Sequence, residues 1–180
     1  MTSEFIIIKT FKSPFGDLLL GSYNKMLCLC DWKYRKMRDS VDNRIKKNLK
    51  SDYKEGNSDI TEETIRQLNE YFSGTRKSFN LPLLLSGSEF QEKVWNELIK
   101  IPYGKAMSYL DLTKKTGDEK AIRAVASANG ANAISIIVPC HRIIGTDGSL
   151  VGYAGGLNTK KKLLQLEGYY PVNQQLSLFD

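Results

Sequence analysis

Cysteine and histidine are scarce in this sequence. Its 180 residues contain three cysteines and one histidine, His141, and the N-terminal half holds Cys28 and Cys30 without any histidine. Disulfide frameworks use more cysteines in pairs, and structural zinc sites use about four Cys or His ligands. We therefore expect a reducing, cytoplasmic setting and no metal. Cys28 and Cys30, two apart on one strand face, are expected to be small core residues.

Long apolar runs, internal repeats and low-complexity tracts are also missing. No segment approaches the roughly 18 apolar residues that a membrane span needs, and the start, MTSEFIIIKTF, lacks the basic region of a signal peptide. Hydrophobic residues make up 41% and charged residues 26%, which favours an ordinary globular core. The net charge of +6 suits a polyanionic partner but does not by itself indicate one.

The first half predicts a small α/β domain, which we place at residues 1–84. Three apolar runs separated by turn residues predict an antiparallel three-stranded sheet: FIIIKTF, LLLGSY and MLCLCDW. The basic stretch 33–58 fits a helix with solvated charges, because apolar residues recur every four positions at Val41, Ile45 and Leu49. Residues 61–72, TEETIRQLNEYF, predict a second helix.

The second half, residues 88–170, predicts a mainly helical domain. Ser88 and Gln91 form a capping box ahead of the helix EFQEKVWNELIK. Two short helices follow, YLDLTKKT and EKAIRAVASAN, joined by a glycine turn in the manner of a helix-turn-helix. That pattern alone is weak, because many helix pairs bind nothing. The glycine-rich loop before the last helix, TKKKLLQLEG, matches no P-loop.

Arg123 lies among small residues in the second of the two short helices. Its neighbours include Ala121, Ala124, Ala126, Ser127 and Ala128. Small side chains let a helix backbone approach a protein core, the commoner case, or a nucleic-acid groove. A buried arginine without a partner is costly, so Arg123 either pairs with a carboxylate or faces a ligand.

Cys140 directly precedes His141 in the stretch ISIIVPCHRIIG, residues 134–145. A thiol is a nucleophile only as thiolate, and a neighbouring base lowers the cost of removing its proton. Neighbouring strand residues point to opposite faces, so contact between the two needs a local turn, which Pro139 favours, or a bridging water. A carboxylate would orient the base, and Glu167 is one of several candidates. For an arbitrary Cys-His pair, a plain core role is the commoner outcome.

The segment around PCHR resembles the active-site region of the alkylguanine-DNA alkyltransferases, also called methylated-DNA–protein-cysteine methyltransferases. The resemblance runs through ANGANAISIIVPCHRIIGTDGSLVGYAGGLNTKKKLLQLEG and upstream through FQEKVWNELIKIPYGKAMSYLDLTKKTGDEKAIRAVASANGAN, about residues 88 to 168. It implies an α+β protein, with a ribonuclease H-like N-terminal domain before a helix-turn-helix domain that carries the acceptor cysteine.

The resemblance implies direct-reversal DNA repair. Cys140 would take a methyl or small alkyl group from oxygen-6 of guanine and keep it, so each molecule acts once and needs no cofactor. His141 would draw the proton off Cys140 through a water, and Glu167 would orient His141. Asn132 would brace that water and the hinge of the site. Tyr109 would donate to the leaving guanine and help to rotate the phosphate of the target nucleotide.

The resemblance also implies how duplex DNA is held. The target base is flipped out at a cost of a few kcal/mol, and Arg123 would fill the space that it leaves. The helix with the small residues would lie in the minor groove, where the implied DNA contacts are Lys120, Ala121, Arg123, Ala124 and Ser127. The implied base pocket comprises Val138, Pro139, Tyr153, Ala154, Gly155 and Gly156. We expect a monomer.

The last ten residues, 171–180, predict a flexible tail. Apolar residues are unusual there, so the tail either packs back on the body or docks in the groove of a partner. Its sequence QLSLF resembles the short motif by which bacterial repair proteins bind the replication sliding clamp, and the motif residues are Gln175, Leu176, Ser177, Leu178 and Phe179.

Three other function classes remain open from the sequence. A protein could bind alkylated bases without transfer, but a related non-transferring group has tryptophan at the acceptor position, where this chain has Cys140. A cysteine hydrolase usually gathers its nucleophile and base from distant segments, whereas the one histidine of this chain is next to Cys140. A plain helix-turn-helix regulator would not depend on Cys140.

Overall fold

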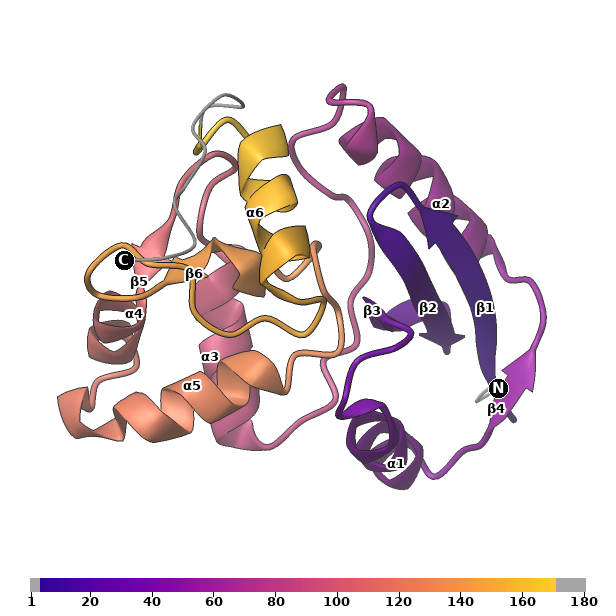
Figure 1. Cartoon of the computed structure of the whole chain (residues 1–180). Coiled ribbons are helices and arrows are strands. Elements are labelled where there is room, and N and C mark those ends of the chain that lie inside the picture. Colours follow the sequence, from indigo (N-terminus) through magenta and orange to yellow (C-terminus); the bar gives the residue numbers. More distant parts are fainter. Residues whose placement is uncertain (1–3, 171–180) are drawn as a thin grey trace.

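The computed structural model describes residues 4–170, and a mixed four-stranded sheet forms its first half (Figure 1). The sheet order is β3-β2-β1-β4, with antiparallel pairs except between β1 and β4, which are parallel. The strands are β1 (Ile6–Ser13), β2 (Gly16–Tyr23), β3 (Met26–Trp32) and β4 (Tyr53–Glu55). The expected α+β class is confirmed, but the expected three-stranded antiparallel sheet lacked β4. This strand has only three residues, Tyr-Lys-Glu, and shows no apolar alternation.

Local signals explain most of the other elements in this half. Asn24 and Lys25 both have positive φ, 49° and 60°, which matches the tight turns that suit the twist of a two-strand hairpin. The two helices are α1 (Arg38–Leu49) and α2 (Asp59–Phe72). Helix α2 begins two residues earlier than predicted, because Ser58 and Thr61 form a reciprocal capping box.

The second half is helical, as expected. It contains α3 (Glu89–Ile99), α4 (Tyr109–Lys115), α5 (Ile122–Gly130) and α6 (Leu157–Leu166). The Ser88–Gln91 capping box of α3 is present. The predicted helix from Glu119 begins as one 3-10 turn, Glu119–Ala121, and becomes α-helical at Ile122. In Figure 1, α4 and α5 lie on the side of the molecule away from the sheet.

A short parallel pairing ties distant parts of the second half together. Strand β5 (Met107–Ser108) pairs with β6 (Ile143–Ile144). Tyr109 follows β5 directly, and the Cys140–Arg142 turn precedes β6 directly. The pairing therefore brings the start of α4 beside the segment that carries Cys140 and His141.

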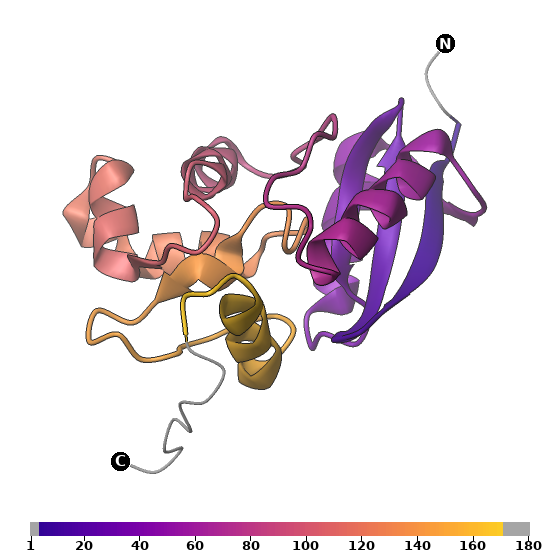
Figure 2. The same cartoon turned by 90° about the horizontal axis from the view of Figure 1, so that it is seen from above.

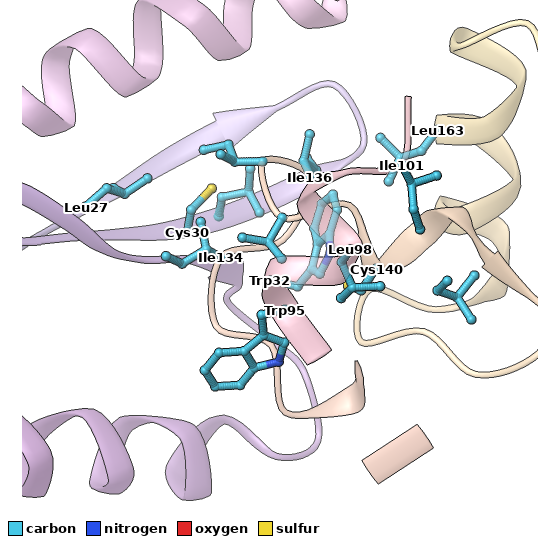
Figure 3. Packing of buried hydrophobic residues seen from close by; sticks show 14 of the residues in the cluster. Leu27, Cys30, Trp32, Trp95, Leu98, Ile101, Ile134, Ile136, Cys140 and Leu163 are labelled. Carbon is cyan, nitrogen blue, oxygen red and sulfur yellow. The ribbon is translucent and has the colours of Figure 1, made fainter. Parts of the chain in front are cut away.

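One hydrophobic core spans both halves of the chain. Leu27, Cys30 and Trp32 from the sheet belong to the same buried cluster as residues of the helical half, among them Trp95, Leu98, Ile134, Ile136, Cys140 and Leu163 (Figure 3). Figure 2 shows the helical half lying beside the sheet and its helices. Cys28 and Cys30 are fully buried, as expected for core residues. The expected shared face is wrong, because the pairing of β2 with β3 shifts register between Gly21 and Ser22 and Cys28 packs in a second buried cluster with Ile6 and Val41.

Backbone and side-chain hydrogen bonds reinforce this junction. Leu27 exchanges two backbone bonds with Pro82 and Leu84 of the connecting segment. Arg35 donates to the carbonyl oxygens of Gly130 and Asn132, and Arg44 donates to that of Ala131 at 2.7 Å. The first half thus fixes the backbone just after α5. The limits 1–84 and 88–170 stay a prediction, and the tail 171–180 lies outside the described residues.

Within residues 4–170, no helix is long and apolar enough to cross a membrane.

Candidate active site

Cys140 opens a single 3-10 turn, Cys140–Arg142, that follows Pro139. The segment before it is irregular and tightly held. Ser135 N donates to Cys30 O, and Val138 N donates to Ile134 O at 2.9 Å. Ile136 adopts φ +72°, which is strained for a β-branched residue and persists only where the surroundings impose it. The turn that Pro139 favoured is therefore present, and its backbone is fixed by the sheet.

Asn132 is a buried polar residue whose side chain contacts Cys140. Its side-chain Nδ2 lies 3.2 Å from Cys140 Sγ and 2.8 Å from the carbonyl oxygen of Val138, to which it donates. Its Oδ1 accepts from Ile134 N at 2.9 Å. Asn132 thus binds both the thiol and the backbone on either side of the strained Ile136.

His141 is fully buried and its imidazole contacts Glu167. Its Nε2 lies 2.7 Å from Glu167 Oε1. Its other ring nitrogen, Nδ1, is buried and has no hydrogen-bond partner within residues 4–170. A carboxylate accepts only, so this contact places the ring proton on Nε2 and leaves a lone pair on Nδ1. The arrangement gives a base whose free nitrogen is not engaged by protein.

Glu167 collects hydrogen bonds from both halves of the chain. Arg142 donates to both carboxylate oxygens, at 2.8 and 3.0 Å. The Tyr71 hydroxyl from α2 donates at 2.7 Å, and Gly104 N donates at 3.3 Å. Burial opposes ionisation, yet the contacts with His141 and Arg142 outweigh it and lower the pKa of Glu167. Glu167 is therefore an ionised, rigidly placed partner for His141.

The thiol and the imidazole are both neutral at rest. Burial raises the pKa of Cys140, although the Asn132 contact and the Lys160 charge act in the opposite direction. Burial lowers the pKa of His141, and Glu167 offsets this only in part. A neutral imidazole can accept a proton, so the site holds a protonated thiol next to a base ready to take its proton.

A cavity of about 980 Å³ opens onto Cys140. Tyr109, Asn129 and Asn132 contribute to its walls, together with the loop residues Gly152, Tyr153, Ala154, Gly155 and Gly156. The expected pocket residues Val138 and Pro139 are buried beside it but are not among its lining residues. His141 and Glu167 do not line the cavity.

Lys160 is a member of the site that sequence reasoning missed. It is fully buried on α6, and its Nζ donates to the carbonyl oxygens of Val151 and Gly152, at 2.7 and 3.2 Å. Burial lowers its pKa to about 8, and the nearby Cys140 opposes that change. Lys160 thus holds the glycine-rich wall of the cavity and places a positive charge near the thiol. Arg142 and Tyr71 were missed as well, because nothing in the sequence places them on Glu167.

Helix α5 exposes one face to solvent, and most of the side chains on that face are small. Val125, Ala128 and Asn129 form its buried side. Its exposed side carries Arg123, Ala124 and Ser127, and the preceding turn exposes Lys120, with Ala121 half-buried. Arg123 has no ion pair among the described residues, so it faces outward rather than a carboxylate. Asn129 donates to the Tyr109 hydroxyl at 3.2 Å, which joins this helix to the cavity.

Two family models match the two halves. The model described as 6-O-methylguanine DNA methyltransferase, ribonuclease-like domain, matches residues 6–85. The model described as the DNA binding domain of the same methyltransferase matches residues 89–169.

Individual relatives agree. A methylated-DNA–protein-cysteine methyltransferase of Methanosarcina acetivorans is 43% identical over 159 residues, which cover 88% of this chain and 96% of the relative. The protein of that name from Mycobacterium leprae is 49% identical over 118 residues, 66% of this chain and 71% of the relative. The structure of Mycobacterium tuberculosis OGT in complex with DNA superposes with a TM-score of 0.77 at 37% identity, covering 89% of this chain and 92% of that one. From both matched halves and these relatives, the chain belongs to the 6-O-methylguanine DNA methyltransferase family.

Proposed function

We propose that this chain is a methylated-DNA–protein-cysteine methyltransferase. It binds DNA and repairs it by moving the alkyl group from oxygen-6 of guanine to Cys140. The observation that carries the proposal is the geometry at Cys140. A thiol opens into a cavity, contacts Asn132 at 3.2 Å and precedes a neutral, buried His141 that is bound to Glu167. This is a nucleophile with a base and an orienting carboxylate, the set that covalent transfer needs.

The transfer step follows from these protonation states. The Cys140 proton moves through one water to Nδ1 of His141, whose Nε2 proton stays on the Glu167 hydrogen bond. The resulting thiolate attacks the alkyl carbon, a C–S bond forms and the C–O bond to guanine breaks. The bonding electron pair leaves on guanine, which takes a proton from the Tyr109 hydroxyl. The proton held by His141 then returns through water to Tyr109, so both side chains end neutral. The Glu167 carboxylate stabilises the imidazolium that forms.

Nothing in this step regenerates Cys140. The C–S bond of a thioether is not cleaved under these conditions, so each molecule transfers one alkyl group and then stops. The cysteine is the final acceptor, and the chain's own residues supply the base and the proton donor. The proposal therefore needs no cofactor.

The placement of α5 supports the proposed DNA contacts. Its exposed face of small residues allows close approach to a minor groove, and Lys120 adds positive charge beside it. The Asn129–Tyr109 contact leads from this helix into the cavity, where a flipped guanine meets Cys140. Arg123 is exposed and has no ion pair with a carboxylate among residues 4–170, and its side chain fills the place of the flipped base.

We also propose that the chain acts as a monomer in the cytoplasm.

The test uses a duplex with one O6-methylguanine inside a restriction site that methylation blocks. After treatment with the protein, the site is expected to become cleavable, and tryptic peptides are expected to carry S-methylcysteine at Cys140. Cys140→Ser is expected to bind the duplex without restoring the site, whereas Cys28→Ser keeps repair. Tight binding by the wild type with no restoration would instead identify a protein that binds alkylated bases without transfer.

We further propose that the tail binds a bacterial replication sliding clamp through Gln175, Leu176, Ser177, Leu178 and Phe179. The support is the QLSLF sequence near the end of the chain; these residues lie outside the described part of the structure. Clamp binding by the full chain and by a chain ending at Val172 is compared by surface plasmon resonance. Loss of binding on truncation supports the proposal, and equal binding contradicts it.

A further inference from the structure

Trp32 brings the sheet domain into the wall of the acceptor cavity. It is the last residue of β3, the residue is 5% exposed, and it lines the same cavity as Cys140 and Tyr153. In Figure 3 it belongs to the packed cluster that also contains Cys140. The described cavity is therefore built by both halves of the chain, although the nucleophile and its base come from the second half alone.

A hydrogen bond connects Trp32 to Tyr153. The indole Nε1 donates to the Tyr153 hydroxyl oxygen at 3.0 Å, and the two rings meet edge to face with centroids 6.2 Å apart. The Tyr153 ring in turn lies edge to face with His141, at 6.4 Å between centroids. An indole N–H is a donor only, so this bond fixes which way the Tyr153 hydroxyl oxygen faces and leaves its proton to donate elsewhere.

The glycine-rich wall lies directly against the same indole. A Cβ placed on Gly155 would come within 2.7 Å of Trp32 Nε1 and Cε2, so only glycine fits at this distance. On another side, Gly16 at φ +134° would bring a Cβ to 3.6 Å from the indole ring. The indole therefore sits in a close-fitting slot between the β1–β2 turn and the loop 152–156.

We propose that Trp32 is a positioning and specificity-determining residue for alkyl transfer: it fixes Tyr153 and the loop 152–156, and so limits the cavity to small alkyl groups. The inference rests on the proposed function. Because Lys160 holds the start of this loop at Val151 and Gly152, and Trp32 holds its middle, the wall has little freedom to retreat from a bulky group. A smaller residue at position 32 would let the wall move and enlarge the cavity.

The experiment compares single-turnover rates on two duplexes that differ only in the lesion, O6-methylguanine or O6-benzylguanine. Trp32→Leu is expected to raise the ratio of benzyl to methyl rates by about tenfold. This is the low end of the rate discrimination that a hydrophobic pocket shows between substrates differing by one methylene group. Trp32→Phe is expected to slow methyl transfer about fivefold, which corresponds to one net hydrogen bond of about 1 kcal/mol.

A double-mutant cycle separates positioning from simple packing. If Trp32 acts through the hydrogen bond, Trp32→Phe combined with Tyr153→Phe is expected to be no slower than Tyr153→Phe alone. Trp95→Phe is the matched control, because Trp95 is the other tryptophan, is also buried and donates its Nε1 to Ala128 O at 2.8 Å. Trp95 does not line the cavity, so the benzyl-to-methyl ratio of Trp95→Phe is expected to equal that of the wild type.

The outcomes distinguish this inference from the proposed function. Circular dichroism shows which variants fold. If Trp32→Leu does not fold, the double-mutant cycle of Trp32→Phe and Tyr153→Phe alone decides whether Trp32 positions Tyr153. Wild-type ratios in both Trp32 variants, with additive effects in the cycle, overturn the role of Trp32 while leaving the transferase intact. A wild-type protein that transfers neither group overturns the proposed function and this inference with it.

Discussion

Glu167 Oε1 lies 2.7 Å from His141 Nε2, and this contact leaves Nδ1 as the buried nitrogen that can accept a proton. The same carboxylate is held by Arg142 from the acceptor turn and by Tyr71 from the sheet domain. The orientation of the base is therefore set by residues from three separate segments. A change at Glu167 is expected to affect stability and chemistry together.

Glu167→Gln is expected to lower the free energy of unfolding by about 3 kcal/mol, because it leaves Arg142 buried without its counter-charge. Methyl transfer is expected to slow by about a hundredfold, the scale of lost general-base help. Urea unfolding and single-turnover rates check the two effects. Glu62→Gln, which breaks an exposed ion pair with Lys9, is the control and is expected to cost less than about 1 kcal/mol. Equal losses of unfolding free energy and of transfer rate in the two variants would show that Glu167 neither anchors Arg142 nor assists His141.

Asn132→Ala is expected to raise the pKa of Cys140 further, because it removes the Nδ2 contact that favours the thiolate. The pH dependence of alkylation by iodoacetamide, with labelled peptides identified by mass spectrometry, measures this pKa. Cys28 is an internal reference, since burial raises its pKa to about 12 and it is expected to remain unlabelled. An unchanged Cys140 profile in a folded Asn132→Ala protein would contradict the role of Asn132.

Lys160→Met is expected to change how stability depends on pH. The pKa of Lys160 is about 8 in the folded protein, below its ordinary value of 10.5, so the unfolded chain binds more protons between these values. The free energy of unfolding therefore gains a contribution that rises with pH across this interval, on the order of 2–3 kcal/mol.

Urea unfolding of wild type and Lys160→Met at pH 7.5, 9 and 10 isolates that contribution as a difference. The wild type is expected to gain stability relative to the variant as the pH rises. Lys47→Met, at an exposed position of α1, is the control and is expected to follow the wild type. A constant difference across the three pH values would mean that folding does not lower the pKa of Lys160.

Arg123→Ala is expected to slow transfer from duplex DNA at least about tenfold. Flipping the target base out of the duplex costs a few kcal/mol, and without Arg123 no side chain fills the gap that the base leaves in the stack. Reaction with free O6-methylguanine base needs no flipping and is expected to be unchanged. Lys47→Ala removes the same charge at a distant exposed site and serves as the control. Equal slowing on duplex and free base would place Arg123 outside the flipping step.

Much of the fold could be predicted because its signals are local. Ser88 and Gln91 cap α3 within four residues of sequence, and Asn24–Lys25 form a turn that depends on no distant contact. Adjacency alone did not identify Cys140 and His141 as reactive; the resemblance of the whole segment around PCHR did. Strand β4 was not predictable, since it depends on pairing with β1 and carries no apolar pattern of its own.

The rest of the site depends on contacts between distant segments. A lysine is seldom fully buried, so nothing in the sequence distinguishes Lys160 from the exposed Lys162 on the same helix. Tyr71 and Glu167 are far apart in sequence and meet only after the two halves pack. The positive φ of Ile136 is unfavourable for its residue type, so local preference predicts the wrong conformation there.

The most direct test of the account is the intact mass of the protein after titration with duplex DNA containing one O6-methylguanine. The account predicts a gain of one methylene unit, located at Cys140, that reaches one per protein molecule and never exceeds it. Cys140→Ala is expected to show no gain while still binding the duplex. Catalytic turnover without a change in mass, or an unmodified wild-type protein bound to its lesion, would contradict the assignment of Cys140 as the final acceptor.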